Sequence, residues 1–187
     1  MENSLFKYLD KYIENFKLKI TEVQLQKNHI KDIFKVLMKY KNKNQVHIFG
    51  NGGSASIASH FSMDLTNNSA IKCISYNDPS IITCYANDFK FENWISRAIT
   101  KYGKKNDILI LISSSGMSKN MINGLKEAKR RKFKKIITFT GFKKNNYLNK
   151  NGDINFWVDS NKYNIIENTH QFFLLMIVDM IKKFNTK

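Results

Sequence analysis

Short apolar runs alternate with amphipathic stretches along most of the chain, and this alternation constrains the fold more than any other feature. Residues 107–112 read DILILI, and residues 46–49 read VHIF. Strands this apolar cannot leave one face of their sheet to water, so both faces must be covered. Because helical stretches separate the strands, the sequence predicts a parallel sheet with helices on both sides, a three-layer α/β/α fold.

The expected elements follow one another without a linker or an internal repeat. Asp78-Pro79 suits a helix start, because proline fits the first helical position, and Gly103 suits a helix end. Residues 1–187 are therefore expected to form a single domain. Strands are expected at 46–49, 71–75, 107–112, 135–140 and 154–158, and helices at 55–66, from 79, and at 91–102, 118–132 and 163–184.

Two amphipathic helices lead the chain, and each needs an apolar surface to cover. The stripe on the first helix consists of Phe6, Leu9, Ile13, Phe16, Ile20 and Val23. It exceeds what one face of a small sheet needs, so we expect it to bury a subunit interface. Residues 1–43 are thus predicted to be a helical extension used in oligomerisation.

Composition limits the class of protein. With 42% hydrophobic residues the chain is not disordered, and 31 Lys plus Arg against 15 Asp plus Glu give a net charge of +16. The lysines are scattered and not interleaved with aromatic residues, which favours a basic surface that attracts an anionic substrate over nucleic-acid binding. Neither a signal peptide nor a membrane span is expected. Cys73 and Cys84 sit in apolar stretches and are expected to be buried thiols, which favours a cytoplasmic location.

The first candidate loop is rich in glycine. Gly50-Asn51-Gly52-Gly53-Ser54-Ala55 follows an expected strand and opens a helix, so its backbone can approach a ligand at the positive end of the helix dipole. The loop also fits the dinucleotide pattern G-x-G-x-x-A, with Asp78 as a candidate ribose-binding acid. A third interpretation is a glycine turn that only reverses the chain.

The second candidate loop is rich in serine. Ser113-Ser114-Ser115-Gly116-Met117-Ser118 lies between a buried strand and a helix. Helix capping explains one serine but not four. Hydroxyls and free backbone N–H groups at a helix N-terminus can hold a phosphate group. The residues of a nucleotide P-loop are missing, so this loop predicts a phosphate site of another kind.

Together the two loops resemble those of the SIS (sugar isomerase) domain family, and most closely those of its phosphoheptose isomerases. The His60-x-x-x-Asp64 pattern and the turn Asn87-Asp88-Phe89 extend the resemblance over nearly the whole chain. It implies a five-stranded parallel core, a homotetramer and a phosphorylated sugar as ligand, in the setting of heptose biosynthesis. It also implies phosphate binding around Ser113, Ser114, Ser115 and Ser118, and sugar contacts around Asn51, Gly52, Gly53, Ser54 and Asp88.

The resemblance is incomplete where the chemistry is expected. Phosphoheptose isomerases typically have His and Glu where this chain has His60 and Asp64, and Gln and a second His where it has Glu167 and Leu175. Those four groups often bind zinc, and the Glu and the second His act as base and acid. Because leucine can do neither, this pair does not carry over. No cofactor is required on this basis, although zinc near His60, Asp64 and Glu167 is one option.

Three interpretations of these residues stay open. In the first, the site is rebuilt, with Glu167 as the base and His60 or Asp64 acting on the substrate oxygens. In the second, the protein binds a phosphosugar without converting it, as a regulator or adaptor. In the third, the polar residues are structural. His47 lies inside a strand and is expected to be structural, and His170 is interpreted as a packing residue.

Overall fold

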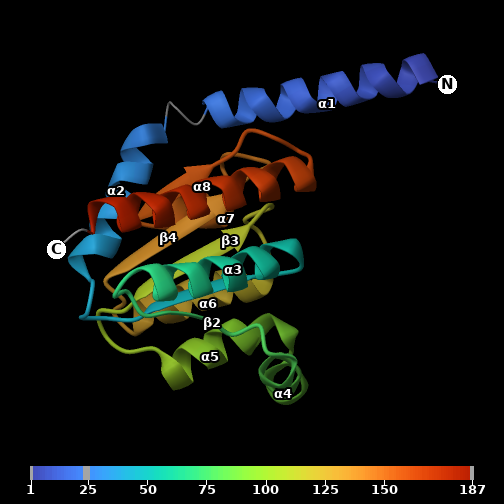
Figure 1. Ribbon diagram of the computed structural model, residues 1–187. Helices are drawn as coiled ribbons and strands as arrows, with labels where there is room; N and C mark the ends of the chain where they lie inside the picture. The colour runs from blue at the N-terminus through green and yellow to red at the C-terminus, as the bar shows by residue number, and fades with distance from the viewer. Residues whose placement is uncertain (1, 23–25, 186–187) are drawn as a thin grey trace.

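The core of the computed structural model, which describes residues 2–22 and 26–185, is a five-stranded parallel sheet (Figure 1). Its strands are β1 (Val46–Gly50), β2 (Cys73–Ser75), β3 (Ile108–Ser113), β4 (Lys135–Thr140) and β5 (Ile154–Trp157). Their order is β2-β1-β3-β4-β5, and all neighbours are parallel. The predicted fold class is confirmed.

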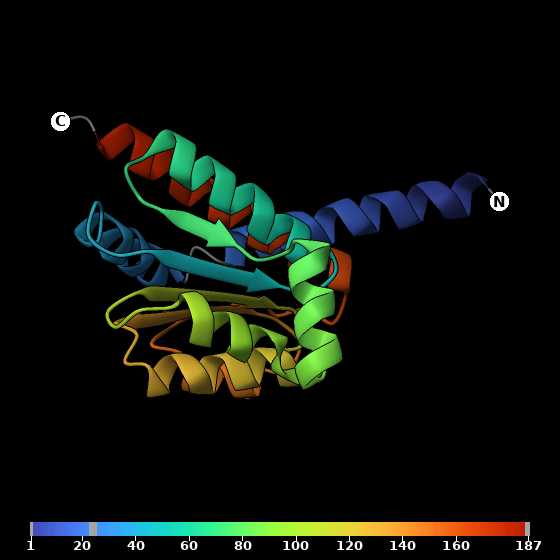
Figure 2. The same cartoon turned by 90° about the horizontal axis from the view of Figure 1, so that it is seen from below.

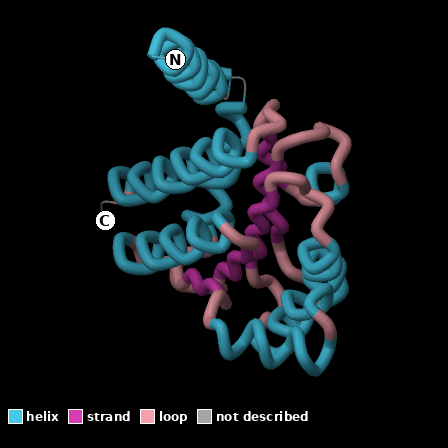
Figure 3. The backbone as a smooth tube through the Cα atoms, turned by 90° about the vertical axis from the view of Figure 1, so that its right-hand side faces the viewer, coloured by secondary structure: helices cyan, strands magenta, loops and turns pink. Residues whose placement is uncertain are grey.

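Two layers of helices cover the sheet, as Figures 2 and 3 show. Alternate side chains of β3 enter opposite cores: Ile108, Ile110 and Ile112 face one layer, whereas Leu109 and Leu111 face the other. This is why the strand is apolar throughout. The first layer consists of α2 (Lys27–Lys39), α3 (Gly53–Asn68) and α8 (Tyr163–Phe184), and the second of α4 (Pro79–Phe89), α5 (Trp94–Tyr102), α6 (Lys119–Arg130) and α7 (Tyr147–Asn151).

The strand order reverses direction between β1 and β3. From β1 the chain moves outward to β2 and then returns to the other side of β1 to form β3. Gly50 at the end of β1 is in register with Ile112 near the end of β3, so the loops that follow the two strands leave the sheet side by side. Ligands of open parallel sheets bind at such a switch point. The glycine-rich and serine-rich loops both lie there.

The first helix, α1 (Glu2–Glu22), projects from the body of the domain (Figure 1). None of its described side chains is buried, and Phe6, Leu9 and Ile13 are 53%, 45% and 47% exposed. Val23, the last residue of the predicted stripe, lies outside the described residues. Ile20 packs against the first core, so a single chain leaves only the N-terminal part of this stripe open, and its burial between subunits stays a prediction.

Element boundaries differ from the expectation in a few places. The helix start at Pro79 is confirmed, and the carboxylate of Asp78 accepts a hydrogen bond from the Ser80 N–H at 2.8 Å. The helix expected at 91–102 begins with a 3₁₀ turn at 91–93 before α5. The short helix α7 was not predicted, because Leu148 is its only buried residue and five residues show no apolar period. The prediction for Cys84 was wrong, since this thiol is exposed while that of Cys73 is buried.

A side chain rather than a strand closes one edge of the sheet. Gln26, just before α2, donates from Nε2 to the Trp157 carbonyl oxygen at 2.6 Å and accepts the Trp157 N–H on Oε1 at 3.0 Å. The amide therefore pairs with edge strand β5 as a neighbouring backbone would. Among the described helices, none is both long and apolar enough to cross a membrane.

His47 has the structural role expected of it. The ring is fully buried, with Nε2 2.9 Å from Asp107 Oδ2 and Nδ1 2.9 Å from the Tyr76 hydroxyl. Burial raises the pKa of Asp107, but hydrogen bonds from His47 and from the N–H groups of Lys104 and Gln45 outweigh it and hold the pKa below its ordinary value. This network ties the starts of β1 and β3 together, at the end of the sheet opposite the two loops.

Candidate active site

The glycine-rich loop turns sharply and is tied to the serine-rich loop by a pair of amides. A Cβ atom on Gly50 would lie 2.1 Å from the Ser54 carbonyl oxygen, so only glycine fits there. Asn51 donates to Asn120 Oδ1 at 3.1 Å, and Asn120 donates back to Asn51 Oδ1 at 2.9 Å. Asn120 Oδ1 also accepts the Met121 N–H at 3.0 Å. Asn120, which sequence reasoning missed, thus joins the first loop to the start of α6.

The serine-rich loop directs its hydroxyls in different ways. Ser113 Oγ accepts the Gly116 N–H and Ser115 Oγ accepts the Met117 N–H, both at 3.2 Å. Each hydroxyl hydrogen is then free to be donated elsewhere, since the oxygen is the acceptor in these bonds. Ser118 is the N-cap residue of α6 without a side-chain cap bond. The buried Ser114 hydroxyl has no partner among the described residues. Capping therefore does not account for the four serines.

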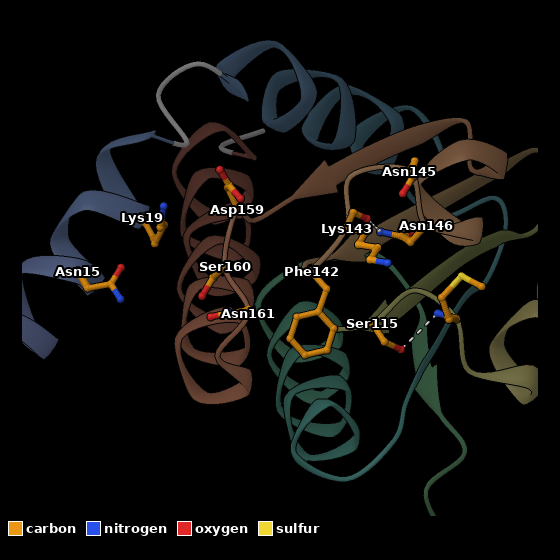
Figure 4. Close-up of a pocket in the computed structure, with 11 residues that line it drawn as sticks. Asn15, Lys19, Ser115, Phe142, Lys143, Asn145, Asn146, Asp159, Ser160 and Asn161 are labelled. Carbon is orange, nitrogen blue, oxygen red and sulfur yellow. Dashed lines mark hydrogen bonds between the residues drawn. The ribbon is translucent and has the colours of Figure 1, made fainter.

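Cavities open on both sides of the serine-rich loop. Ser118, Asn120 and Asn51 line one of about 400 Å³. Ser115 borders a larger one of about 1180 Å³, across which Lys19 on α1 faces the loops that carry Lys143 and Asp159 (Figure 4). The loop is therefore accessible to a ligand from either side.

The predicted acid–base residues gather on the far side of the glycine-rich loop. Helices α3 and α8 run side by side (Figure 2). Glu167, His60 and Gln171 line a cavity of about 320 Å³ between these helices. His60 Nε2 lies 3.2 Å from Asp64 Oδ2, one helical turn further along α3. The carboxylate of Asp64 is not part of the lining and contacts the site only through His60. His60, Asp64 and Glu167 are thus brought together where α3 packs against α8.

The Glu167 carboxylate rests directly on the N-terminus of α3. An added Cβ on Gly53 would lie 2.3 Å from Glu167 Oε2, so this glycine leaves room for the carboxylate. Burial raises the pKa of Glu167, and a hydrogen bond from the Ser54 hydroxyl lowers it by less. A carboxylate with a raised pKa and access to a cavity is suited to take a proton from carbon near neutral pH.

Three further residues considered in the sequence analysis do not line the cavity that contains Glu167. Asp88 is exposed near the end of α4, accepts a hydrogen bond from the Asn87 amide at 3.0 Å and lines neither of the two smaller cavities. Leu175 is two turns beyond Glu167 and is also absent from the lining of its cavity. His170 is fully buried, with Nε2 donating to the Thr140 carbonyl oxygen at 3.1 Å, and burial lowers its pKa to about 4. It is neutral and serves packing, as expected.

The arrangement does not fit a bound zinc ion. In the part of the chain that the structure describes, no three His, Cys, Asp or Glu side chains form a group able to hold a metal. His60 is engaged by Asp64, and Glu167 by Ser54. A structural zinc site needs four such ligands, and a catalytic one needs three with water in the fourth position.

Comparison with known proteins places this geometry in a family. The model of the SIS domain matches residues 11–141, and the chain belongs to the SIS domain family. Glu167 lies beyond the matched residues, so the family match says nothing about its role. The fold and the family match together define the chain as a sugar isomerase domain of the α/β class.

Individual relatives narrow the class. The chain is 37% identical over 144 residues to a phosphoheptose isomerase of Buchnera aphidicola subsp. Acyrthosiphon pisum (strain Tuc7), covering 74% of this chain and 70% of that protein. It is 42% identical over 107 residues to one of Glaesserella parasuis serovar 5 (strain SH0165), covering 54% and 55%. A solved phosphoheptose isomerase from Francisella tularensis superposes with a TM-score of 0.87 at 26% identity, covering 95% of this chain and 98% of that one.

Proposed function

We propose that the chain is an aldose–ketose isomerase that interconverts sedoheptulose 7-phosphate and an aldoheptose 7-phosphate. The names of its relatives support this reaction, and one observation carries it to this chain. The Glu167 carboxylate, with its raised pKa, lies on Gly53 at the same carboxyl end of the strands as the serine-rich loop. A base for carbon and a cradle for phosphate are the two parts that such an isomerase needs.

The reaction moves one proton between adjacent carbons through an enediol. Glu167 takes the proton from C1 of the ketose and the electron pair of the C–H bond forms the C1–C2 double bond. The C2 carbonyl oxygen takes up a proton from His60, and the proton on the C1 hydroxyl returns to His60 as the aldehyde forms. Glu167 then delivers its proton to C2. Every group ends in its starting state, so the site is ready for another turnover.

Asp64 has a supporting part in this scheme. Its carboxylate lies against His60 Nε2 at 3.2 Å and orients the ring, which leaves the other ring nitrogen for the substrate oxygens. Asp64 is therefore a positioning residue, whereas His60 and Glu167 are the proposed catalytic residues. This division follows from the cavity lining, which includes His60 and Glu167 but not Asp64.

We assign the phosphate group to the serine-rich loop. Ser113 and Ser115 accept backbone N–H groups, which leaves their own hydrogens for the phosphate oxygens. Ser118 adds a hydroxyl at the positive end of α6. Asn51, fixed by Asn120, lies between this loop and the acid–base cluster and is proposed to contact the sugar.

The proposed enzyme works as a homotetramer in the cytoplasm, with residues 1–187 as a single SIS domain. The N-terminal part of the apolar stripe of α1, exposed in the single chain at Phe6, Leu9 and Ile13, supports assembly through this helix. The two free thiols, Cys73 and Cys84, suit a reducing compartment.

Solvent exchange tests the activity. In D₂O, the wild-type protein should place deuterium on C1 of sedoheptulose 7-phosphate and on C2 of the aldose product, because a carboxylate base exchanges its proton with solvent. Glu167→Gln should slow the exchange by about 10²–10⁴-fold while the variant still binds the sugar phosphate. If the wild-type protein binds the sugar phosphate without any exchange, the proposed isomerase activity is wrong and the protein is a phosphosugar-binding regulator.

A further inference from the structure

Lys90, which ends α4, has a backbone conformation that lysine rarely adopts. Its φ of 71° and ψ of 147° lie in a region that suits glycine and strains any residue with a Cβ atom. The surrounding turn is fixed from outside. The Asn93 N–H donates to the Lys90 carbonyl oxygen at 3.0 Å, and the Asn123 amide on α6 donates to Asn93 Oδ1 at 3.0 Å. Strain that is held in place in this way points to a function.

The strained residue lines the phosphate side of the site. Lys90 borders the 400 Å³ cavity together with Asn51 and Ser118. In the described part of the chain its ammonium has no hydrogen-bond or ion-pair partner. Lys119 and Glu92 line the same cavity 3.8 Å apart and offset each other's charge. The cavity therefore keeps one uncompensated positive charge, which favours an anionic ligand.

From this juxtaposition we infer that Lys90 binds the phosphate group of the substrate, an inference that rests on the proposed phosphosugar isomerase. The serine-rich loop offers hydroxyls and backbone N–H groups but no formal charge. An ammonium adds charge-assisted hydrogen bonds, which are about twice as strong as neutral ones. Its flexible stem also lets the charge reach the phosphate from a fixed backbone. This role explains why lysine occupies a position where glycine would be free of strain.

Replacing Lys90 tests the charge and the strain by two separate measurements, the affinity and the thermal midpoint. Lys90→Gly removes both, so affinity for sedoheptulose 7-phosphate should fall about tenfold or more. The thermal midpoint should at the same time rise by about 2–4 °C as the strain is released. Lys90→Arg keeps the charge and should bind within about threefold of wild type. Lys143→Gln removes a lysine from the cavity on the other side of the loop and should leave affinity unchanged.

Titration calorimetry with sedoheptulose 7-phosphate and, separately, with inorganic phosphate distinguishes the outcomes. Wild-type affinity in Lys90→Gly overturns the inference, as does a loss of affinity in Lys143→Gln but not in Lys90→Gly. A lower midpoint in Lys90→Gly overturns the strain argument. If the wild-type protein neither binds the sugar phosphate nor exchanges its protons, the proposed function fails, and the inorganic phosphate titration still decides whether Lys90 binds an anion.

Discussion

A methyl group at residue 53 tests whether the position of the Glu167 carboxylate matters. In Gly53→Ala, the new Cβ would lie 2.3 Å from Glu167 Oε2 and 2.9 Å from Cδ. Ordinary contact begins near 3.4 Å, so the carboxylate must move by about 1 Å. A shift of this size at the reacting atoms can cost about 10²-fold in rate, or about 2.7 kcal/mol in the barrier.

The fold should tolerate the same change. Gly53 is the first residue of α3, its φ is not positive, and alanine favours a helix over glycine by up to about 1 kcal/mol. Steady-state kinetics should therefore show kcat reduced about 10²-fold, with a thermal midpoint at or slightly above that of wild type. Loss of activity together with loss of structure would point to a packing defect instead.

A second substitution shows whether the effect passes through the carboxylate. Glu167→Asp shortens the side chain by one methylene and leaves room for the added methyl group. In a double-mutant cycle, Gly53→Ala should cost much less in the Glu167→Asp background than in wild type. Equal costs in both backgrounds, or a Gly53→Ala enzyme with wild-type kcat, would refute the assignment of Glu167 as the base.

Four further outcomes are expected. Glu167→Gln should lower kcat by about 10²–10⁴-fold with a smaller change in substrate affinity, as stopped assays would show. The double variant Ser113→Ala, Ser115→Ala should bind phosphosugar at least about tenfold more weakly in calorimetry, and unchanged affinity would remove the loop from the site. The pKa of His170 is about 4 in the folded protein and ordinary in the unfolded chain, so the unfolded state binds the proton first as the pH falls. Urea titrations should therefore show a free energy of unfolding about 2 kcal/mol lower at pH 5 than at pH 7. This loss should be absent in His170→Gln. Light scattering should give a mass well above the 21.9 kDa monomer, and a monomer at micromolar concentration would refute assembly through α1.

The sequence predicts the sheet and the two loops well because their signals are local. A strand that is apolar at every position, such as 108–112, must lie between two cores, and turn residues mark its end. The sequence indicates less clearly which face of a helix is buried. Ile81, Ile82 and Tyr85 pack against one core, whereas Cys84 on the same helix is exposed. An apolar neighbourhood in sequence therefore placed this thiol wrongly.

Contacts between distant segments account for what the sequence could not predict. The stripe of α8 indicates that Glu167 and Gln171 share a face, but not that the carboxylate rests on Gly53. That contact depends on how α3 and α8 pack. The amide pair of Asn51 and Asn120 depends in the same way on the register of β1 with β3. Each local pattern was visible, and only the fold shows which patterns meet.

The pairing of Gln26 with Trp157 affects the tendency of this protein to aggregate at high concentration. An unpaired edge strand can recruit a strand from another molecule, and such recruitment begins aggregation. The Gln26 amide occupies both backbone groups of Trp157 and so blocks this position of β5 against an incoming chain. Because Gln26 directly precedes α2, the same two hydrogen bonds fix where that helix starts relative to the sheet. One glutamine thus blocks one position of the β5 edge against an incoming strand and also anchors the start of α2.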